Sequence, residues 1–359
     1  MLSLDVFRGL TIALMVVVND AGGRVSYAPL NHSAWNGWTL TDTVFPSFLW
    51  IVGVAITLSL GKRVTAGASR RELLPGIVRR AAILFLFGMA IYAFPHFDLG
   101  TQRILGVLQR IAICYLIASL IFLYSGIRSQ VLWTVGLLAA YWLMMKLIPV
   151  PGYGAGHLDM EGNFAHYIDR IVLGHHNYAS THSWDPEGLV STLPAIATTL
   201  LGVLAGHILR LKESITERTV RFFLAGNLLV AAGYICSIWL PINKKLWTDS
   251  FTLLMAGLNF VVMAILLWTL DIRRWTWAAR PFAIFGMNAI TVYLASEFLN
   301  EALQAIKWHN VSLQQVLYIT LFAPLASPPN ASLLYAIAFT LCMYTLAHFM
   351  YKRGWFLRV

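Results

Sequence analysis

The sequence predicts an all-α membrane protein with ten transmembrane helices, both termini in the cytoplasm and one short re-entrant or interfacial segment near 316–325. Three observations support this fold class. Hydrophobic residues make up 58% of the 359 residues and charged residues only 12%, about half the charged fraction of an ordinary soluble domain. Apolar runs of about 20 residues, the length that crosses the hydrocarbon layer, recur along the chain. Basic residues gather in alternate connections between these runs.

Windows of this length place the ten spans in chain order. They are expected near 4–21, 43–60, 78–94, 104–124, 131–148, 189–209, 221–240, 250–270, 281–299 and 332–351. A further apolar stretch at 316–325 has only about ten residues, which is too few to span. We find no internal repeat, linker or low-complexity tract, so we expect a single membrane domain over 1–359.

The charges of the connections support ten spans rather than eleven. Connections 61–77, 210–220 and 271–280 are rich in lysine and arginine, whereas loop 22–42 has only Arg24 and loop 149–188 only Arg170. Cytoplasmic connections carry the excess of basic residues. Ten spans place both termini on the basic side, together with the tail residues Lys352, Arg353 and Arg358.

The net charge of +10 is therefore mainly a signal of topology. With so apolar a composition, it does not indicate a nucleic-acid partner; the partner that the sequence predicts is the lipid bilayer. For some of the cytoplasmic arginines a second interpretation remains open: besides marking the topology, they would bind an anionic co-substrate.

Polar side chains converge at the extracytoplasmic ends of the predicted spans. Ionisable groups at this depth are costly and usually face a cavity or a partner. The residues concerned are Asn19, Asp20, His32, Trp35, Asn36, Asp42, Gln109, Arg110, Asp185, Glu187, Lys244 and Lys245.

Arg110 lies about one and a half turns into the fourth span, where a charge requires compensation. We expect an acidic partner for it, and Asp42, Asp185 and Glu187 are the candidates at the same depth. A purely structural ion pair and a role in binding substrate are both open interpretations.

His32 lies in a short aromatic loop between two spans, near carboxylates that would orient it. A neutral imidazole in this place accepts a proton from an amine or a hydroxyl group. The alternative is a solvated loop histidine without a catalytic role.

Two features at other depths have structural and functional interpretations. Arg8 lies one turn after Asp5 at the cytoplasmic start of the first span, so it either forms a local ion pair or faces a phosphate group. Asn288 places an amide within the ninth span, as a contact between helices or as a ligand-binding group.

No metal site is expected. Five histidines fall in the loop 149–188, but their spacing matches no recognised ligand pattern. The three cysteines lie within apolar runs and are interpreted as packing residues.

Several motifs together resemble a known family, the membrane acetyltransferases typified by heparan-alpha-glucosaminide N-acetyltransferase. The resemblance covers nearly the whole chain, in order. Its motifs are Leu4-Asp5-Val6-Phe7-Arg8-Gly9-Leu10, Asn19, His32-Ser33-Ala34-Trp35-Asn36-Gly37-Trp38-Thr39-Leu40-Thr41-Asp42, Val44-Phe45-Pro46, Gly106-Val107-Leu108-Gln109-Arg110, Asp185-Pro186-Glu187-Gly188, Leu201-Gly202-Val203-Leu204-Ala205-Gly206, Pro241-Ile242-Asn243-Lys244-Lys245-Leu246-Trp247 and Gly286-Met287-Asn288.

The resemblance implies transfer of an acetyl group from cytoplasmic acetyl-CoA to the amino group of a glucosamine on the other side of the membrane. It also implies that His32 is the catalytic histidine and Asn19 a neighbouring active-site residue. A similarity to bacterial membrane proteins encoded with N-acetylglucosamine utilisation functions implies a small amino sugar and a bacterial inner membrane. A homodimer is expected from the family as well.

These expectations combine into one mechanistic hypothesis. The nucleotide of CoA is held at the cytoplasmic mouth near Arg8, Arg79 and Arg80, and the thioester arm reaches between the helices towards His32. His32 acts as general base, Asp42 orients it and Asn19 donates to the oxyanion. The remaining candidate residues for binding the sugar or the acyl-CoA are Trp35, Asn36, Gln109, Arg110, Asp185, Glu187, Lys245 and Asn288.

Three alternatives stay open. An acetyl-histidine intermediate would replace direct transfer. A second alternative is that the protein is an amino-sugar transporter of the inner membrane. Many carriers are built from inverted repeats, and we find none in this sequence. The third alternative is an O-acyltransferase that modifies a hydroxyl of a cell-envelope glycan.

Overall fold

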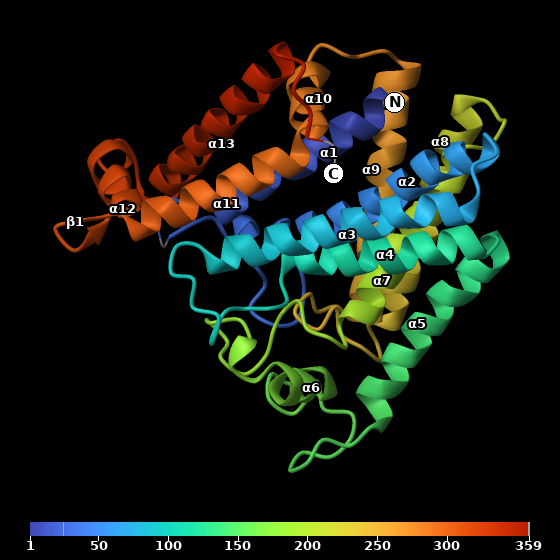
Figure 1. Ribbon diagram of the computed structural model, residues 1–359, viewed down its shortest axis with the longest axis horizontal. Coiled ribbons are helices and arrows are strands. Elements are labelled where there is room, and N and C mark those ends of the chain that lie inside the picture. Colours follow the sequence, from blue (N-terminus) through green and yellow to red (C-terminus); the bar gives the residue numbers. More distant parts are fainter. Residues whose placement is uncertain (24, 358–359) are drawn as a thin grey trace.

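A computed structural model describes residues 1–23 and 25–357, and it is almost entirely helical (Figure 1). Arg24 of loop 22–42 and Arg358 of the tail lie outside these residues. The helices are α1 (Leu2–Asn19), α2 (Val44–Thr65), α3 (Arg70–Ala93), α4 (Val107–Tyr124), α5 (Ile127–Leu147), α6 (Phe164–Leu173), α7 (Thr192–Leu209), α8 (Ile215–Cys236), α9 (Asp249–Leu266), α10 (Ala279–Met287), α11 (Ala289–Ala305), α12 (Leu313–Leu317) and α13 (Pro328–Lys352). Two short strands, β1 (Lys307–Trp308) and β2 (Val311–Ser312), form an antiparallel hairpin.

Nine helices among the described residues are long and apolar enough to cross a membrane. The number becomes ten when α10 and α11 are counted as one broken span. The prediction of an all-α protein with ten spans is therefore confirmed at this upper count. Side-chain caps fix several helix starts, because Ser69 accepts a hydrogen bond from the amide of Glu72 and Ser214 forms a capping box with Glu217.

The span expected at 281–299 is bent rather than continuous. Helices α10 and α11 meet at Asn288 with a change of direction of 79°, which is visible where the two helices join in Figure 1. Asparagine leaves the helical conformation easily because its side chain competes for backbone hydrogen bonds. A broken helix in an apolar bundle is tolerated where it is buried in protein or lines a cavity.

The segment predicted to be re-entrant or interfacial is a short apolar helix. It consists of α12 and a π-helical turn, Tyr318–Phe322. Ten residues in a helix rise only about 15 Å, about half the thickness of the hydrocarbon layer.

The connections on one side of the bundle pack against one another, and we call this side the loop end. The amide of Gly37 donates to the carbonyl of Ile242 over 2.7 Å, and the indole of Trp35 donates to the carbonyl of Leu158 over 3.1 Å. These contacts join connections 20–43, 148–191 and 237–248. The opposite side carries the arginine-rich connections, and we call it the basic end.

Glycines allow helices α2 and α7 to cross with their backbones in close approach. A Cβ atom on Gly53 would lie 1.9 Å from the carbonyl oxygen of Thr199, and one on Gly202 would lie 2.0 Å from that of Trp50. Small residues of this kind are the usual way for helices to pack closely in membranes.

Replacing Gly202 with alanine is expected to lower the free energy of unfolding by about 1–3 kcal/mol or more, because the added methyl group meets backbone and the helices must separate. Denaturation of the purified protein in detergent measures the change. Gly136→Ala is the matched control, since Gly136 lies on α5 with nothing within 4 Å of its added Cβ. Equal losses in both variants would contradict the packing argument.

Candidate active site

A histidine and a buried carboxylate form a dyad at the loop end. The Nδ1 atom of His32 lies 2.7 Å from Oδ1 of Asp42. The other carboxylate oxygen of Asp42 accepts hydrogen bonds from the backbone amides of Ser33 and Thr39, each over 3.0 Å. The Asp42 side chain is only 1% exposed, whereas that of His32 is 51% exposed. A fixed acceptor at Nδ1 leaves Nε2 with its lone pair directed away from the carboxylate, which is the arrangement of a general base.

Lys244 completes this group, although the sequence pointed to it only as one of the polar residues at this end and not as a binding residue. Its Nζ atom lies 3.0 Å from Nδ1 and 3.4 Å from Nε2 of His32, and 3.6 Å from Oδ1 of Asp42. Burial lowers the pKa of Lys244, and the nearby carboxylates of Asp42 and Glu187 oppose that effect. The signal in the sequence was the pair of adjacent lysines, of which only Lys245 was chosen.

The predicted residues Trp35, Asn36 and Lys245 support the loop that carries His32. The amide of Asn243 donates to Oδ1 of Asn36 over 3.2 Å, which ties this loop to connection 237–248. Lys245 donates to the carbonyl of Ala34 over 2.5 Å and lies 5.8 Å from the centre of the Trp35 ring.

The ring of Trp35 packs edge-on against a stacked aromatic pair. His166 and Trp184 lie parallel, with ring centroids 4.1 Å apart, and Trp35 meets both rings edge-on. Burial lowers the pKa of His166 to about 3, so this histidine stays neutral and serves as a packing group. The pair gives the His32 loop a rigid base.

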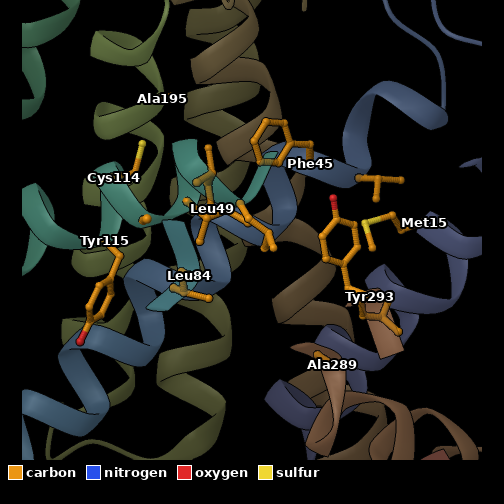
Figure 2. Close-up of a cluster of buried hydrophobic side chains, with 14 of the residues drawn as sticks. Met15, Phe45, Leu49, Leu84, Cys114, Tyr115, Ala195, Ala289 and Tyr293 are labelled. Atoms are coloured by element: carbon orange, nitrogen blue, oxygen red, sulfur yellow. The ribbon is translucent and has the colours of Figure 1, made fainter. Parts of the chain in front are cut away.

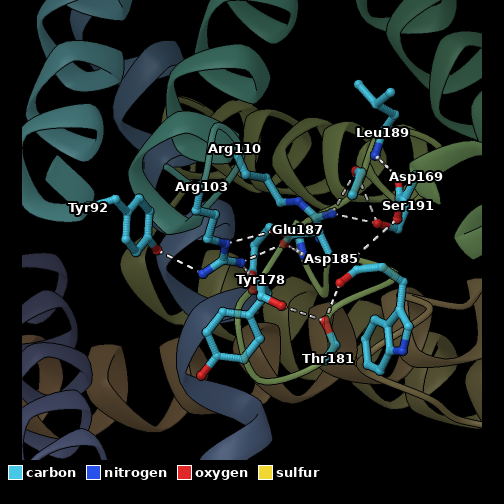
Figure 3. A network of polar contacts seen from close by, with 12 residues as sticks. Tyr92, Arg103, Arg110, Asp169, Tyr178, Thr181, Asp185, Glu187, Leu189 and Ser191 are labelled. Atoms are coloured by element: carbon cyan, nitrogen blue, oxygen red, sulfur yellow. Dashed lines mark hydrogen bonds and ion pairs between the residues drawn. The ribbon is translucent and has the colours of Figure 1, made fainter. Parts of the chain in front are cut away.

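A second polar group at the loop end is centred on Arg103 (Figure 3). Its guanidinium binds Asp185 through two hydrogen bonds of 2.7 and 2.5 Å, and it contacts Glu187 over 2.5 Å. It also donates to the hydroxyl of Tyr92 over 3.0 Å and lies against the ring of Tyr178. Burial would raise the pKa of Glu187, but Arg103 holds it below its usual range.

Arg110 does not have the acidic partner that we expected. Within the part of the chain that the structure describes, no carboxylate lies within ion-pair distance of it. Its guanidinium instead donates to the carbonyl of Gly188 over 3.0 Å and to the hydroxyl of Ser191 over 2.5 Å. It also lies 5.2 Å from the centre of the Trp247 ring. Of the three candidate carboxylates, Asp185 and Glu187 bind Arg103 and Asp42 binds His32. Arg103 precedes α4 and was missed because it lies outside the helix.

A cavity of about 420 Å³ runs between α1, α2, α3, α4 and the broken pair α10 and α11. Arg8 and Arg80 line its part nearer the basic end, and Met15, Phe48 and Tyr293 line its part nearer the loop end. Most of its wall is apolar; Figure 2 shows the part of the wall around Met15, Leu84 and Tyr293.

The two cavity arginines are held by different contacts. Arg8 donates to the carbonyl of Gly286 over 3.3 Å and lies 3.5 Å from Asp5, so the predicted local ion pair is present beside the cavity. Arg80 lies 4.8 Å from the centre of the Tyr115 ring. Arg79, which was predicted with them, is exposed on α3 and is not among the described residues that line the cavity.

Three further predicted residues lie apart from the dyad. Asn19 donates to Glu297 over 3.5 Å, and no hydrogen bond joins it to His32 among the described residues. Gln109 packs against Gly88, where a Cβ would lie 2.2 Å from its Oε1. Asn288 is buried at the break between α10 and α11. The side-chain amides of both Gln109 and Asn288 have no hydrogen-bond partner among the described residues.

Within the described residues, no group of three or more histidine, cysteine, aspartate or glutamate side chains is arranged to hold a metal ion.

Comparison with known proteins identifies the family. The family model described as the catalytic region of heparan-alpha-glucosaminide N-acetyltransferase matches residues 1–240. Heparan-alpha-glucosaminide N-acetyltransferase of Mus musculus is 32% identical, over 82% of this chain and 53% of that protein. The Homo sapiens enzyme of the same name is 31% identical, over 82% of this chain and 52% of that protein. The chain thus spans about half the length of these relatives, and it belongs to the heparan-alpha-glucosaminide N-acetyltransferase family.

Proposed function

We propose that this protein transfers an acetyl group from cytoplasmic acetyl-CoA to the amino group of a glucosamine-type sugar at the loop end. The observation that carries the proposal is the contact of 2.7 Å between His32 and the buried Asp42. Asp42 of this dyad lies two residues before the start of α2, whose residues Phe48 and Ile51 line the cavity. A base at the loop end and a cavity below it are what transfer across the bundle requires.

The cavity suits the thioester arm of CoA. Arg8 and Met15 are seven residues apart on α1 and both line it, so it extends about 10 Å along the helix. Its volume of about 420 Å³ falls within the range of small-molecule sites. Arg8 and Arg80 supply positive charge on the side where the phosphates of CoA would enter, and the buried amide of Asn288 lies beside the lining residues Met287 and Ala289.

The chemistry follows from the dyad. The sugar nitrogen attacks the thioester carbon as Nε2 of His32 takes its proton, the new N–C bond forms, and the C–S bond breaks. The sulfur leaves with the electron pair and takes up a proton, so the products are the N-acetyl sugar and CoA. Asp42 orients the imidazole and stabilises its charged form. We place Asn19, with Glu297, on the acceptor side.

The basic connections favour a cytoplasmic basic end and an extracytoplasmic loop end. From the family resemblance, we propose in addition that the protein lies in a bacterial inner membrane and acts as a homodimer.

The test is release of CoA from acetyl-CoA by the purified protein in detergent, with and without glucosamine. Release that depends on glucosamine and yields N-acetylglucosamine would support the proposal. Release with a hydroxyl acceptor alone would indicate an O-acyltransferase. Passage of unmodified glucosamine into proteoliposomes, without release of CoA, would indicate a transporter.

A further inference from the structure

Tyr293 lines the cavity, and its hydroxyl has no hydrogen-bond partner among the described residues. Tyr293 is the fifth residue of α11, directly after the break at Asn288. Its side chain lines the cavity, and the residue is only 7% exposed. Apart from the hydrogen bonds of the helix itself, its backbone carbonyl accepts a hydrogen bond from the hydroxyl of Ser296. The hydroxyl itself makes no hydrogen bond to any residue that the structure describes.

The polar groups of the cavity wall are few. Among the described lining residues, the side chains that can donate a hydrogen bond are Arg8, Arg80, Tyr115 and Tyr293. Arg80 and Tyr115 contact each other, and Arg8 binds Gly286 nearby. Tyr293 is therefore the one donor of this set at the end of the cavity that lies towards the dyad.

The ring of Tyr293 lies on the side of the cavity towards the loop that carries His32 and Asp42. Figure 2 shows the ring of Tyr293 beside Met15, with its hydroxyl on the side of Phe45. Phe45 follows Asp42 by three residues, about one turn of helix.

We infer that the Tyr293 hydroxyl donates a hydrogen bond to the carbonyl oxygen of the acetyl thioester and to the oxyanion into which this oxygen develops. The inference rests on the proposed function. The amine nitrogen adds to the carbonyl carbon, negative charge accumulates on the oxygen, and it disperses as the C–S bond breaks. Tyr293 keeps its proton throughout, so it needs no further reactant. This assigns to Tyr293 the donor role that the sequence suggested for Asn19, whose amide binds Glu297 instead.

Tyr293→Phe tests the inference, because it removes the hydroxyl and keeps the ring. The turnover number for acetyl transfer is expected to fall about 10²–10³-fold, the usual effect of losing one oxyanion donor, with little change in KM for acetyl-CoA. Tyr335→Phe is the matched control: Tyr335 is 5% exposed on α13 and does not line the cavity among the described residues. It is expected to retain normal turnover.

A spectroscopic measurement separates a hydrogen bond from a packing role. In the infrared spectrum of the complex with acetyl-CoA labelled with ¹³C at the carbonyl, the C=O band should lie at higher frequency in Tyr293→Phe than in the wild type. Unchanged turnover or an unchanged band in that variant would overturn the inference, as would an equal loss in Tyr335→Phe.

The band does not depend on the acceptor, so the two proposals can fail separately. A band shift without transfer to any amine would refute the proposed function and leave the role of Tyr293 standing. Normal transfer to glucosamine in Tyr293→Phe would refute the role of Tyr293 and leave the proposed function standing. If acetyl-CoA does not bind at all, both are refuted.

Discussion

Replacing His32 with alanine is expected to lower the turnover number for acetyl transfer by about 10²–10⁴-fold, the contribution of a positioned general base. The side chain is half exposed, and its polar contacts are with Asp42 at Nδ1 and with Lys244 at both ring nitrogens. The fold should therefore tolerate the change, and binding of acetyl-CoA should persist. Turnover with glucosamine and equilibrium binding of acetyl-CoA, measured on the same preparation, test both statements.

His157 supplies a matched control for His32. It also pairs with an aspartate, but its Nδ1 lies 3.5 Å from Asp159 and both side chains are about half exposed. His157→Ala is expected to retain normal turnover. Near-normal turnover of His32→Ala would eliminate both the base and the nucleophile version of the mechanism.

The same preparation distinguishes direct transfer from an acetyl-histidine intermediate. With acetyl-CoA and no acceptor, an acetylated His32 would release about one equivalent of CoA per site in a rapid burst. Direct transfer releases none until the amine is added. The burst should be absent in His32→Ala in either case.

The sequence predicted the dyad because short connections bring their own residues together. His32 and Asp42 are ten residues apart in one loop between two spans, and the structure places them in contact. The fold class was predictable for a similar reason: the lengths of apolar runs and the charges of the connections act locally and do not depend on how the helices pack.

The cavity and the hydrogen-bond donors in its wall could not be predicted from such local features of the sequence. Arg79 and Arg80 are neighbours in the chain, but successive residues of a helix project about 100° apart. Only Arg80 lines the cavity, and the rotation of α3 that decides this is set by its packing against α4. The bend at Asn288, which brings Tyr293 to the cavity, likewise depends on tertiary contacts.

Arg103 shows how a small error in a helix boundary changes a pairing. The fourth span was expected to begin near 104, which drew attention to Arg110 within it. The helix begins at Val107, and the preceding segment is extended enough for Arg103 to reach Asp185 and Glu187. An ion pair between two connections leaves no periodic signal in the sequence.

Replacing Arg103 with alanine is expected to lower the free energy of unfolding by about 3–5 kcal/mol, because removal of one partner leaves buried charge without compensation. The side chains of Asp185 and Glu187 are 0% and 9% exposed, and the guanidinium itself is 10% exposed. Denaturation of the purified protein in detergent measures the loss.

Arg221 provides the contrast that isolates burial as the cause. It binds Glu213 through two hydrogen bonds of 2.7 Å, a geometry close to that of Arg103 with Asp185. Its side chain is 55% exposed at the basic end of α8, where solvent screens the pair. The free energy of unfolding of Arg221→Ala should therefore be close to that of the wild type. Equal losses of this free energy in Arg221→Ala and Arg103→Ala would show that geometry rather than burial determines the effect.

A double variant separates lost attraction from uncompensated charge. In Arg103→Met combined with Asp185→Asn, one of the two stranded carboxylates becomes neutral, so part of the stability lost in Arg103→Met should return. The non-additivity of the two changes is the coupling between the residues. If the double variant is as unstable as the sum of the single ones, the carboxylate is not the source of the penalty, and Arg103 stabilises the loop end through its contacts with Tyr92 and Tyr178 instead.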